Sequence, residues 1–260
     1  MKTWAGLHPL TRGLTLTALG IVALNVALAL AGYNTALHHA AAFLLGSAHQ
    51  DSWEPMRQAL AYVRSGAPEP LYDVVFFQRG TIFTYPTTSL LFMELAGRLT
   101  GQPLAANGAL NVVSWLAVAA TLAVVARMLT ESARVHLPEL RTASALERWL
   151  LWLVGASLTL VFYPVVKAFT LGQVQTVVTE LVAGGALAWV RRRERWAGVL
   201  LALACLFKPQ VGLLVVWAAL RRRWRFTGAW LAVVLPLGLW SVARYGVADR
   251  KSTRLNSSHT

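Results

Sequence analysis

An aspartate at the start of a predicted surface helix is the first candidate for chemistry. Asp51 precedes residues 52–65, where Met56, Leu60 and Val63 fall on one helical face and the arginines fall elsewhere. This pattern indicates a short helix that lies in a membrane interface. A carboxylate in front of a helix is either a helix cap or a general base that takes a proton from a hydroxyl group. The residues alone leave both roles open for Asp51.

Two lysines could hold an anionic group. Lys208 is the one lysine inside an apolar run, residues 196–220, and Pro209 follows it. Its amine could reach the membrane interface along the aliphatic stem, or it could bind a lipid phosphate. Lys167, a few residues before the pair Gly172-Gln173, is a weaker candidate for the same phosphate role.

Glu180 lies in the middle of another apolar run, residues 171–190. An ionisable group is costly at that depth, so we expect a polar cavity or a partner around it. Spacings of three and four residues put Gln173, Thr176 and Glu180 on one helical face. The alternative is a hydrogen bond between helices that serves packing alone.

Metal and cofactor sites have little support. His38, His39 and His49 lack a clear ligand spacing, and the single cysteine, Cys205, excludes a multi-cysteine site. A Gly-rich phosphate loop is also missing from the sequence, which disfavours a soluble nucleotide-sugar substrate. We therefore expect no metal and no cofactor.

The composition indicates that these residues belong to a polytopic membrane protein. The 260-residue chain is 56% hydrophobic and 13% charged, with a mean hydropathy of +0.52, which is more apolar than soluble domains of this size. The formal net charge is +13, but the basic residues cluster between apolar runs, where membrane topology explains them. We predict an all-α transmembrane helix bundle and no nucleic-acid binding.

Five apolar runs are long enough to cross a bilayer. Residues 13–32 contain no charge and would form a helix of about 30 Å; the other predicted spans are residues 108–126, 149–166, 171–190 and 226–243. The broken run 196–220 is predicted to be a hairpin with Lys208 at its tip. A continuous span there would place a cluster of arginines on the outer side of the membrane.

The basic residues also predict the orientation. With the N-terminus in the cytoplasm, most Lys and Arg residues, including those of 191–195 and 221–225, lie on the inner side. The long segment between the first two spans is then extracytoplasmic and contains Asp51. Within it, residues 83–99 are predicted to form an interfacial or partly embedded helix, because a full span would reverse every later helix.

The chain changes character near its C-terminus. From Asp249 to His259 an abrupt polar string resembles a translated sequencing adapter. We expect residues 1–248 to be the N-terminal part of a longer membrane protein, and residues 249–260 to be a non-native tail. Such a fragment is expected to be inactive.

Several short motifs occur in a recognisable order. They are Asp51 before its interfacial helix, Gly66 leading into Pro70-Leu71-Tyr72-Asp73, Phe83-Thr84-Tyr85-Pro86, Gly172-Gln173, and Ala197-Gly198 running to Lys208-Pro209. Together they resemble glycosyltransferase family 87, bacterial membrane mannosyltransferases of the GT-C superfamily that use polyprenyl-phosphate-mannose. The chain departs from the family pattern where an aromatic, a second proline and an asparagine are usual, at Pro55-Met56, Thr87 and Gln175.

The resemblance implies a GT-C-like enzyme of the bacterial inner membrane with its active site outside the cytoplasm. It implies an inverting transferase in which Asp51 is the general base, and in which a glycolipid or glycan accepts the sugar as polyprenyl phosphate leaves. The donor phosphate would be bound by Lys208, Lys167 and Arg57, and the substrates by Tyr72, Tyr85, Gln173 and Glu180.

Two other functions fit the residues. A transporter or flippase subunit would use Glu180 and Lys208 as a polar pair near the membrane midplane, although we see no internal repeat. A noncatalytic scaffold would tolerate replacement of Asp51, Glu180 and Lys208. The large outer segment that begins with Asp51 favours an enzyme.

Overall fold

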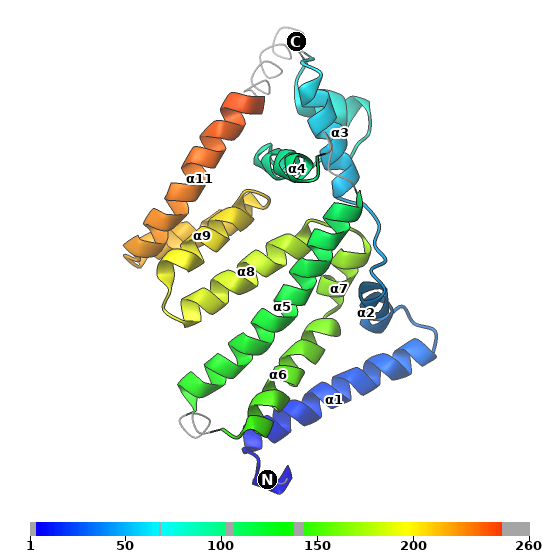
Figure 1. The fold of residues 1–260 in the computed structure, drawn as a ribbon, viewed down its shortest axis with the longest axis vertical. Coiled ribbons are helices and arrows are strands. Elements are labelled where there is room, and N and C mark those ends of the chain that lie inside the picture. The colour runs from blue at the N-terminus through cyan, green and yellow to red at the C-terminus, as the bar shows by residue number, and fades with distance from the viewer. Residues whose placement is uncertain (1–3, 68, 102–106, 138–142, 246–260) are drawn as a thin grey trace, which may run out of the picture.

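The computed structural model describes residues 4–67, 69–101, 107–137 and 143–245. Within these ranges the regular elements are helices and there is no strand, which confirms the all-α prediction (Figure 1). The predicted tail, residues 249–260, lies outside the described residues. After a short 3₁₀ turn, η1 (Trp4–Gly6), the chain enters its first long helix.

Three helices are long and apolar enough to cross a membrane: α1 (Pro9–Leu30), α5 (Asn107–His136) and α11 (Trp224–Tyr245). They confirm three of the predicted spans, although α5 continues ten residues beyond the predicted end at residue 126. Its last turns carry Arg127 and Arg134 past the apolar part. The chain is therefore a multi-pass membrane protein.

The predicted span 149–166 is not one straight helix. Helix α6 (Ala145–Leu160) ends before Val161, and α7 (Tyr163–Thr170) follows at an angle of 56°, so the two make up at most one broken span. Pro164 accounts for the break. Its ring would clash with the carbonyl of Leu160 in a continuous helix, and it has no N–H to donate.

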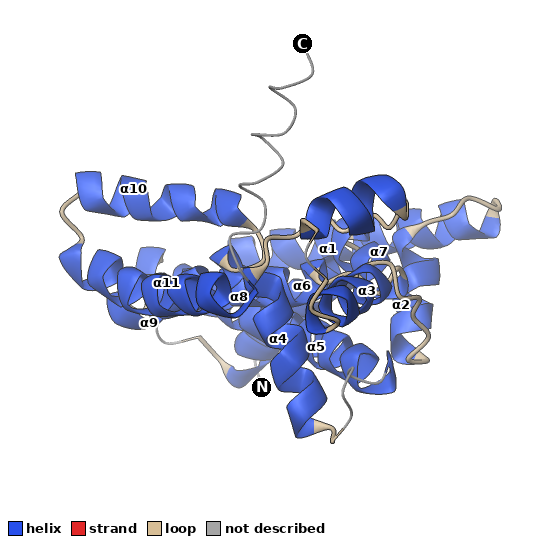
Figure 2. Ribbon diagram, turned by 90° about the horizontal axis from the view of Figure 1, so that it is seen from above, coloured by secondary structure: helices blue, strands red, loops and turns tan. Residues whose placement is uncertain are grey.

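The predicted hairpin is confirmed. Helix α9 (Glu194–Cys205) ends before Lys208, a short 3₁₀ turn η4 (Pro209–Gly212) reverses the chain, and α10 (Leu213–Leu220) returns. Figure 2 shows α10 lying above α9 and α11. Arg223, just after α10, donates a 3.0 Å hydrogen bond to Glu194 at the start of α9, so the two ends of the hairpin lie together.

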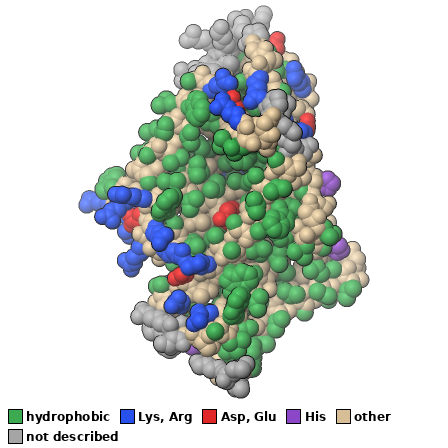
Figure 3. Space-filling model, viewed as in Figure 1, with side chains coloured by type: hydrophobic (Ala, Val, Ile, Leu, Met, Phe, Trp, Pro, Cys, Tyr) green, Lys and Arg blue, Asp and Glu red, His purple; other side chains and the backbone are tan. Residues whose placement is uncertain are grey.

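Basic side chains gather at one end of the helices, which we name the arginine end. Arg191 donates a 3.0 Å hydrogen bond to Glu131 of α5, and Arg127 lies 3.8 Å from the same carboxylate. Figure 3 shows basic side chains along the left and lower left of the molecule, with a broad apolar band beyond them and a second, smaller basic group near the top.

The segment between α1 and α5 folds into four short elements: α2 (Ala36–Leu44), α3 (Trp53–Arg64), the π-helix η2 (Asp73–Gln78) and α4 (Thr88–Leu99). On α3, Met56 and Leu60 are fully buried, which confirms a helix with one apolar face. That face packs on the protein core and not on lipid, as a helix lying in the membrane interface would require. Helix α4 has 12 residues and is about 18 Å long, too short for a full span.

The core of this segment also packs on the later helices. Fully buried Trp53, Phe83, Leu90 and Met93 form one cluster with Val174 of the turn before α8 and with residues of the α9 end. Helix α8 (Gln175–Val190) packs along α5 and α9. Burial of these large side chains, each worth about 1.5–3 kcal/mol, fixes α3 and α4 above the ends of α8 and α9.

Candidate active site

Asp51 is held against the turn that leads into α8. The backbone N–H groups of His49 and Asp51 donate 2.8 Å hydrogen bonds to the carbonyls of Thr170 and Leu171, and Ser52 donates to Gly172 at 3.2 Å. This short backbone pairing brings the two motifs together across more than 100 residues of sequence. The Asp51 carboxylate Oδ2 accepts a 2.6 Å hydrogen bond from Nε2 of Gln173.

Gly172 is required at this turn for two separate reasons. Its φ of +66° lies in the left-handed region that L side chains rarely adopt. A Cβ built on it would also lie 1.9 Å from the carbonyl oxygen of His49, a distance that no side chain tolerates. The Gly-Gln motif therefore permits the close backbone approach and supplies the partner of Asp51.

The turn also corrects the predicted start of the fourth span. Residues 171–190 were expected to form one helix, but α8 begins at Gln175 because the chain turns at Gly172. The shorter helix of 16 residues is not counted among the candidate spans. The prediction that Gln173 and Glu180 share a helical face is wrong for the same reason, since Gln173 precedes the helix.

Two tyrosines close the site next to Asp51. The hydroxyls of Tyr85 and Ser52 are 2.7 Å apart, and the Tyr72 hydroxyl donates to the backbone carbonyl of Tyr85 at 2.5 Å. Burial raises the pKa of Tyr85; its hydrogen bond to Ser52 opposes this and the negative charge of Asp51 adds to it. Tyr85 therefore stays a neutral phenol at physiological pH, able to donate and to accept hydrogen bonds.

Lys208 approaches the same group from the hairpin tip. Its Nζ lies 5.8 Å from the centre of the Tyr85 ring, within the range of a cation–π contact. The carbonyl of Leu206, two residues earlier, accepts a 2.5 Å hydrogen bond from Thr88 at the start of α4. The structure thus brings together five of the predicted site residues, which are Asp51, Gln173, Tyr72, Tyr85 and Lys208.

The other predicted site residues have different surroundings. Arg57 on α3 forms an ion pair with Glu54 and donates a 3.3 Å hydrogen bond to Gln50, next to Asp51. Lys167 on α7 instead lies near buried His39 of α2, whose pKa is lowered by burial first and by the charge of Lys167 second. A phosphate-binding role for either cation stays a prediction.

Glu180 lies more than one turn inside α8, away from Gln173. Its carboxylate accepts a 3.1 Å hydrogen bond from Thr121 of α5, which is the interhelical contact that the packing alternative predicts. Its role in substrate binding stays a prediction. The alternative that Asp51 caps a helix is wrong. The N-cap residue of α3 is Ser52, and no side chain forms a capping hydrogen bond there.

Sequence reasoning missed a cluster around Glu94 of α4. This buried carboxylate accepts hydrogen bonds from Arg244 at 3.0 Å, Tyr245 at 2.9 Å and Arg98 at 3.4 Å, and Arg64 lies 3.8 Å away. The one available signal was that arginines on the predicted outer side are unusual. Their partner could not be read from the sequence, since Glu94 and Arg244 are 150 residues apart.

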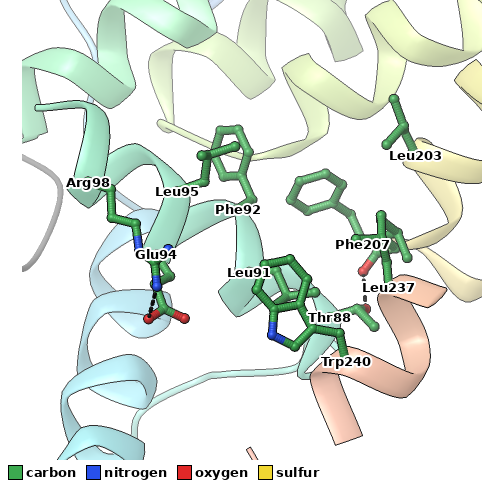
Figure 4. A pocket seen from close by; sticks show the side chains of 11 residues that line it. Thr88, Leu91, Phe92, Glu94, Leu95, Arg98, Leu203, Phe207, Leu237 and Trp240 are labelled. Carbon is green, nitrogen blue, oxygen red and sulfur yellow. Dashed lines mark hydrogen bonds and ion pairs between the residues drawn. The ribbon is translucent and has the colours of Figure 1, made fainter. Parts of the chain in front are cut away.

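An apolar cavity of about 210 Å³ lies beside this cluster. Figure 4 shows Glu94 and Arg98 on one side, and the aromatic rings of Phe92, Phe207 and Trp240 around the space. Its walls come from α4, from α9 with the residues after it, and from α11. Thr88 and Leu206 both line the cavity and are joined by a hydrogen bond, and Leu206 is two residues before Lys208.

Comparison with known families identifies the chain. The model of glycosyltransferase family 87 matches residues 83–251, a range that includes Tyr85, Gln173 and Lys208 and begins after Asp51. No curated protein and no solved structure matches the chain. Because the family match covers more than half of the sequence, the chain belongs to glycosyltransferase family 87 and is a membrane glycosyltransferase.

Proposed function

We propose that the protein transfers mannose from a polyprenyl-phosphate donor to a glycolipid or glycan outside the cytoplasm, with inversion at the sugar. The observation that carries the proposal is the Asp51–Gln173 hydrogen bond, held by the backbone pairing of residues 49–52 with the Gly172 turn. A carboxylate that is exposed yet fixed in direction has the properties of a general base. Its position before α3 also places it near the positive end of that helix.

In the proposed reaction the acceptor hydroxyl oxygen attacks the anomeric carbon of the donor. The bond between that carbon and the phosphate oxygen breaks, and its electron pair leaves with polyprenyl phosphate. The hydroxyl proton passes to Asp51, whose Oδ2 is held by Gln173. Lys208 lies one ring away, over Tyr85, where its charge would stabilise the departing phosphate.

The two tyrosines and Gln173 would hold the sugars around this reaction. Tyr85 is fixed by Ser52 and by the Tyr72 hydroxyl on its carbonyl, so the ring that faces Lys208 has a defined position. Arg57, linked to Asp51 through its neighbour Gln50, would be the second cation near the phosphate. The orientation with this site outside the cytoplasm agrees with the arginine clusters at the opposite end.

The geometry does not favour the transporter alternative. Glu180 bonds to Thr121 and Lys208 lies over Tyr85, and among the described residues no ion pair joins Glu180 to Lys208. The polar pair that transport was expected to use is therefore not formed. Activity in detergent, without a sealed membrane, would separate transfer from transport.

The test is the Asp51→Asn variant of the full-length protein in detergent, supplied with polyprenyl-phosphate-mannose and a glycolipid acceptor. General bases contribute about 10²- to 10⁴-fold, so kcat should fall by that factor while thermal stability is kept. Glu69→Gln is the matched control, because Glu69 is an exposed carboxylate of the same segment that the mechanism does not use. Turnover by Asp51→Asn equal to that of Glu69→Gln would exclude Asp51 as the base.

A further inference from the structure

The cluster around Glu94 has an excess of positive charge, because three arginines surround one carboxylate. The Glu94 side chain is 8% exposed, whereas those of Arg98 and Arg244 are 65% and 50% exposed. With Arg64 at 3.8 Å, three guanidinium groups surround one carboxylate. Glu94 is ionised, because the hydrogen bond from Arg244 is the largest effect and lowers its pKa against the opposing effect of burial.

Glu94 fixes the two exposed guanidinium groups without using all their donors. Each guanidinium has five N–H bonds in a planar fork, and Arg98 and Arg244 each donate one hydrogen bond to Glu94. At least half of each arginine side chain is exposed, so the N–H groups that Glu94 does not use are accessible to a ligand. Forked, charged donors of this kind match the oxygens of a phosphate.

The apolar cavity starts at the same place. Glu94 and Arg98 line one side of it, and Leu91, Phe92, Leu203, Phe207, Leu237 and Trp240 line much of the rest. Its walls come from α4, α9 and α11, so the cavity lies between these helices. Arg98 lines the cavity itself, and Arg244 is held beside it by its hydrogen bond to Glu94. Two cations next to an apolar cavity in a membrane protein are complementary to a ligand with an anionic head and a hydrocarbon chain.

We propose that Arg98 and Arg244 bind the phosphate of an anionic phospholipid whose hydrocarbon chain enters the cavity between α4, α9 and α11. This site goes beyond the proposed transfer reaction and does not use Asp51. The lipid would join α4 to α11 and would contact Leu206 and Phe207, which precede Lys208. Its presence would therefore stabilise the position of the hairpin tip.

Binding can be measured without any transfer assay. The protein is purified in a neutral detergent, and phosphatidylglycerol is added while bound lipid is counted by native mass spectrometry and thermal unfolding is followed. Phosphatidylglycerol should raise the unfolding temperature, and phosphatidylcholine should not. Replacing both arginines, Arg98→Gln with Arg244→Gln, should weaken binding by about tenfold or more, since one charge-assisted hydrogen bond is worth at least about that factor.

The matched control removes two arginines from the opposite end. In Arg191→Gln with Arg223→Gln the lost groups also pair with glutamates, at 3.0 Å each, and phosphatidylglycerol binding should be unchanged. Equal loss in both double variants would reduce the effect to net charge and overturn the site. If the Arg98/Arg244 variant fails to fold, Leu237→Trp provides the test, because it fills the cavity and leaves both guanidinium groups in place.

Two further probes identify the occupant. Inorganic phosphate alone should stabilise the protein much less than phosphatidylglycerol; equal stabilisation would show that the hydrocarbon chain is not bound and would overturn the proposal. Sugar-free polyprenyl phosphate is the competitor. If it binds through Arg98 and Arg244 while phosphatidylglycerol does not, the cavity belongs to the donor lipid and the proposal is wrong.

Discussion

Replacing Gly172 by alanine tests whether the turn before α8 holds Asp51 in its working position. The new Cβ would lie 1.9 Å from the His49 carbonyl oxygen and 2.9 Å from the Gln50 nitrogen, so the two backbone segments must separate. The three hydrogen bonds between them are worth about 0.5–1.5 kcal/mol each. The left-handed φ of +66° adds about 1–2 kcal/mol of strain for a residue with a Cβ.

The expected loss of stability is therefore about 2.5–6.5 kcal/mol if all three hydrogen bonds break. It is smaller if the segment yields locally. Separation also moves Asp51 away from Gln173, and a misplacement of about 1 Å in a catalytic group costs about 10²-fold in rate. We expect kcat for glycosyl transfer to fall by at least this factor, with a smaller change in KM.

Gly66→Ala is the control that separates strain from the clash. Gly66 has nearly the same φ, +69°, but nothing lies within 4 Å of its added Cβ. It should lose only the conformational strain, about 1–2 kcal/mol, and keep a normal kcat. If Gly172→Ala and Gly66→Ala have equal kcat values, the close backbone approach does not position the base and the reasoning fails.

Three other predictions follow from neighbouring contacts. Gln173→Leu removes the donor to Asp51 and should lower kcat by about tenfold, the factor that corresponds to one charge-assisted hydrogen bond, with little change in unfolding temperature; a normal kcat would contradict the positioning role. Tyr85→Phe and Ser52→Ala each break the same 2.7 Å bond and should each cost about 0.5–1.5 kcal/mol, and thermal unfolding of the double variant should show less than the sum of the two losses. The lowered pKa of His39, due to burial and then to Lys167 and His38, means that the unfolded chain binds the proton more readily, so stability should fall as the pH drops below about 6.5; an equally steep fall in His39→Gln would refute this assignment.

Local rules predicted the parts of the fold that depend on neighbouring residues. Pro209 ends α9 where the hairpin was expected, and the spacing of Met56 and Leu60 identified the buried face of α3. Pro164 also breaks a helix, but it lies inside a run so apolar that hydropathy alone indicates one span. The same limit hides the turn at Gly172, whose effect depends on the approach of His49 from more than 100 residues away.

The candidate site was predictable only in part for a similar reason. The order of the motifs indicated that Asp51, Tyr85, Gln173 and Lys208 belong to one site, but it did not indicate which of their atoms are in contact. Nothing local marks Glu94 as the partner of Arg244, because that ion pair exists only after α4 and α11 have packed. Pairings of this kind depend on tertiary contacts that composition and periodicity do not encode.

The hairpin that carries Lys208 has a consequence for how the family can vary. Both ends of the hairpin are tied at the arginine end through Arg223 and Glu194, so the length of α9, 12 residues, determines how far the amine reaches. One inserted residue would advance the tip by about 1.5 Å and rotate it by about 100°, turning Lys208 away from Tyr85. Relatives that use the same donor should therefore exchange apolar side chains along α9 freely while keeping the number of residues between Glu194 and Lys208 constant.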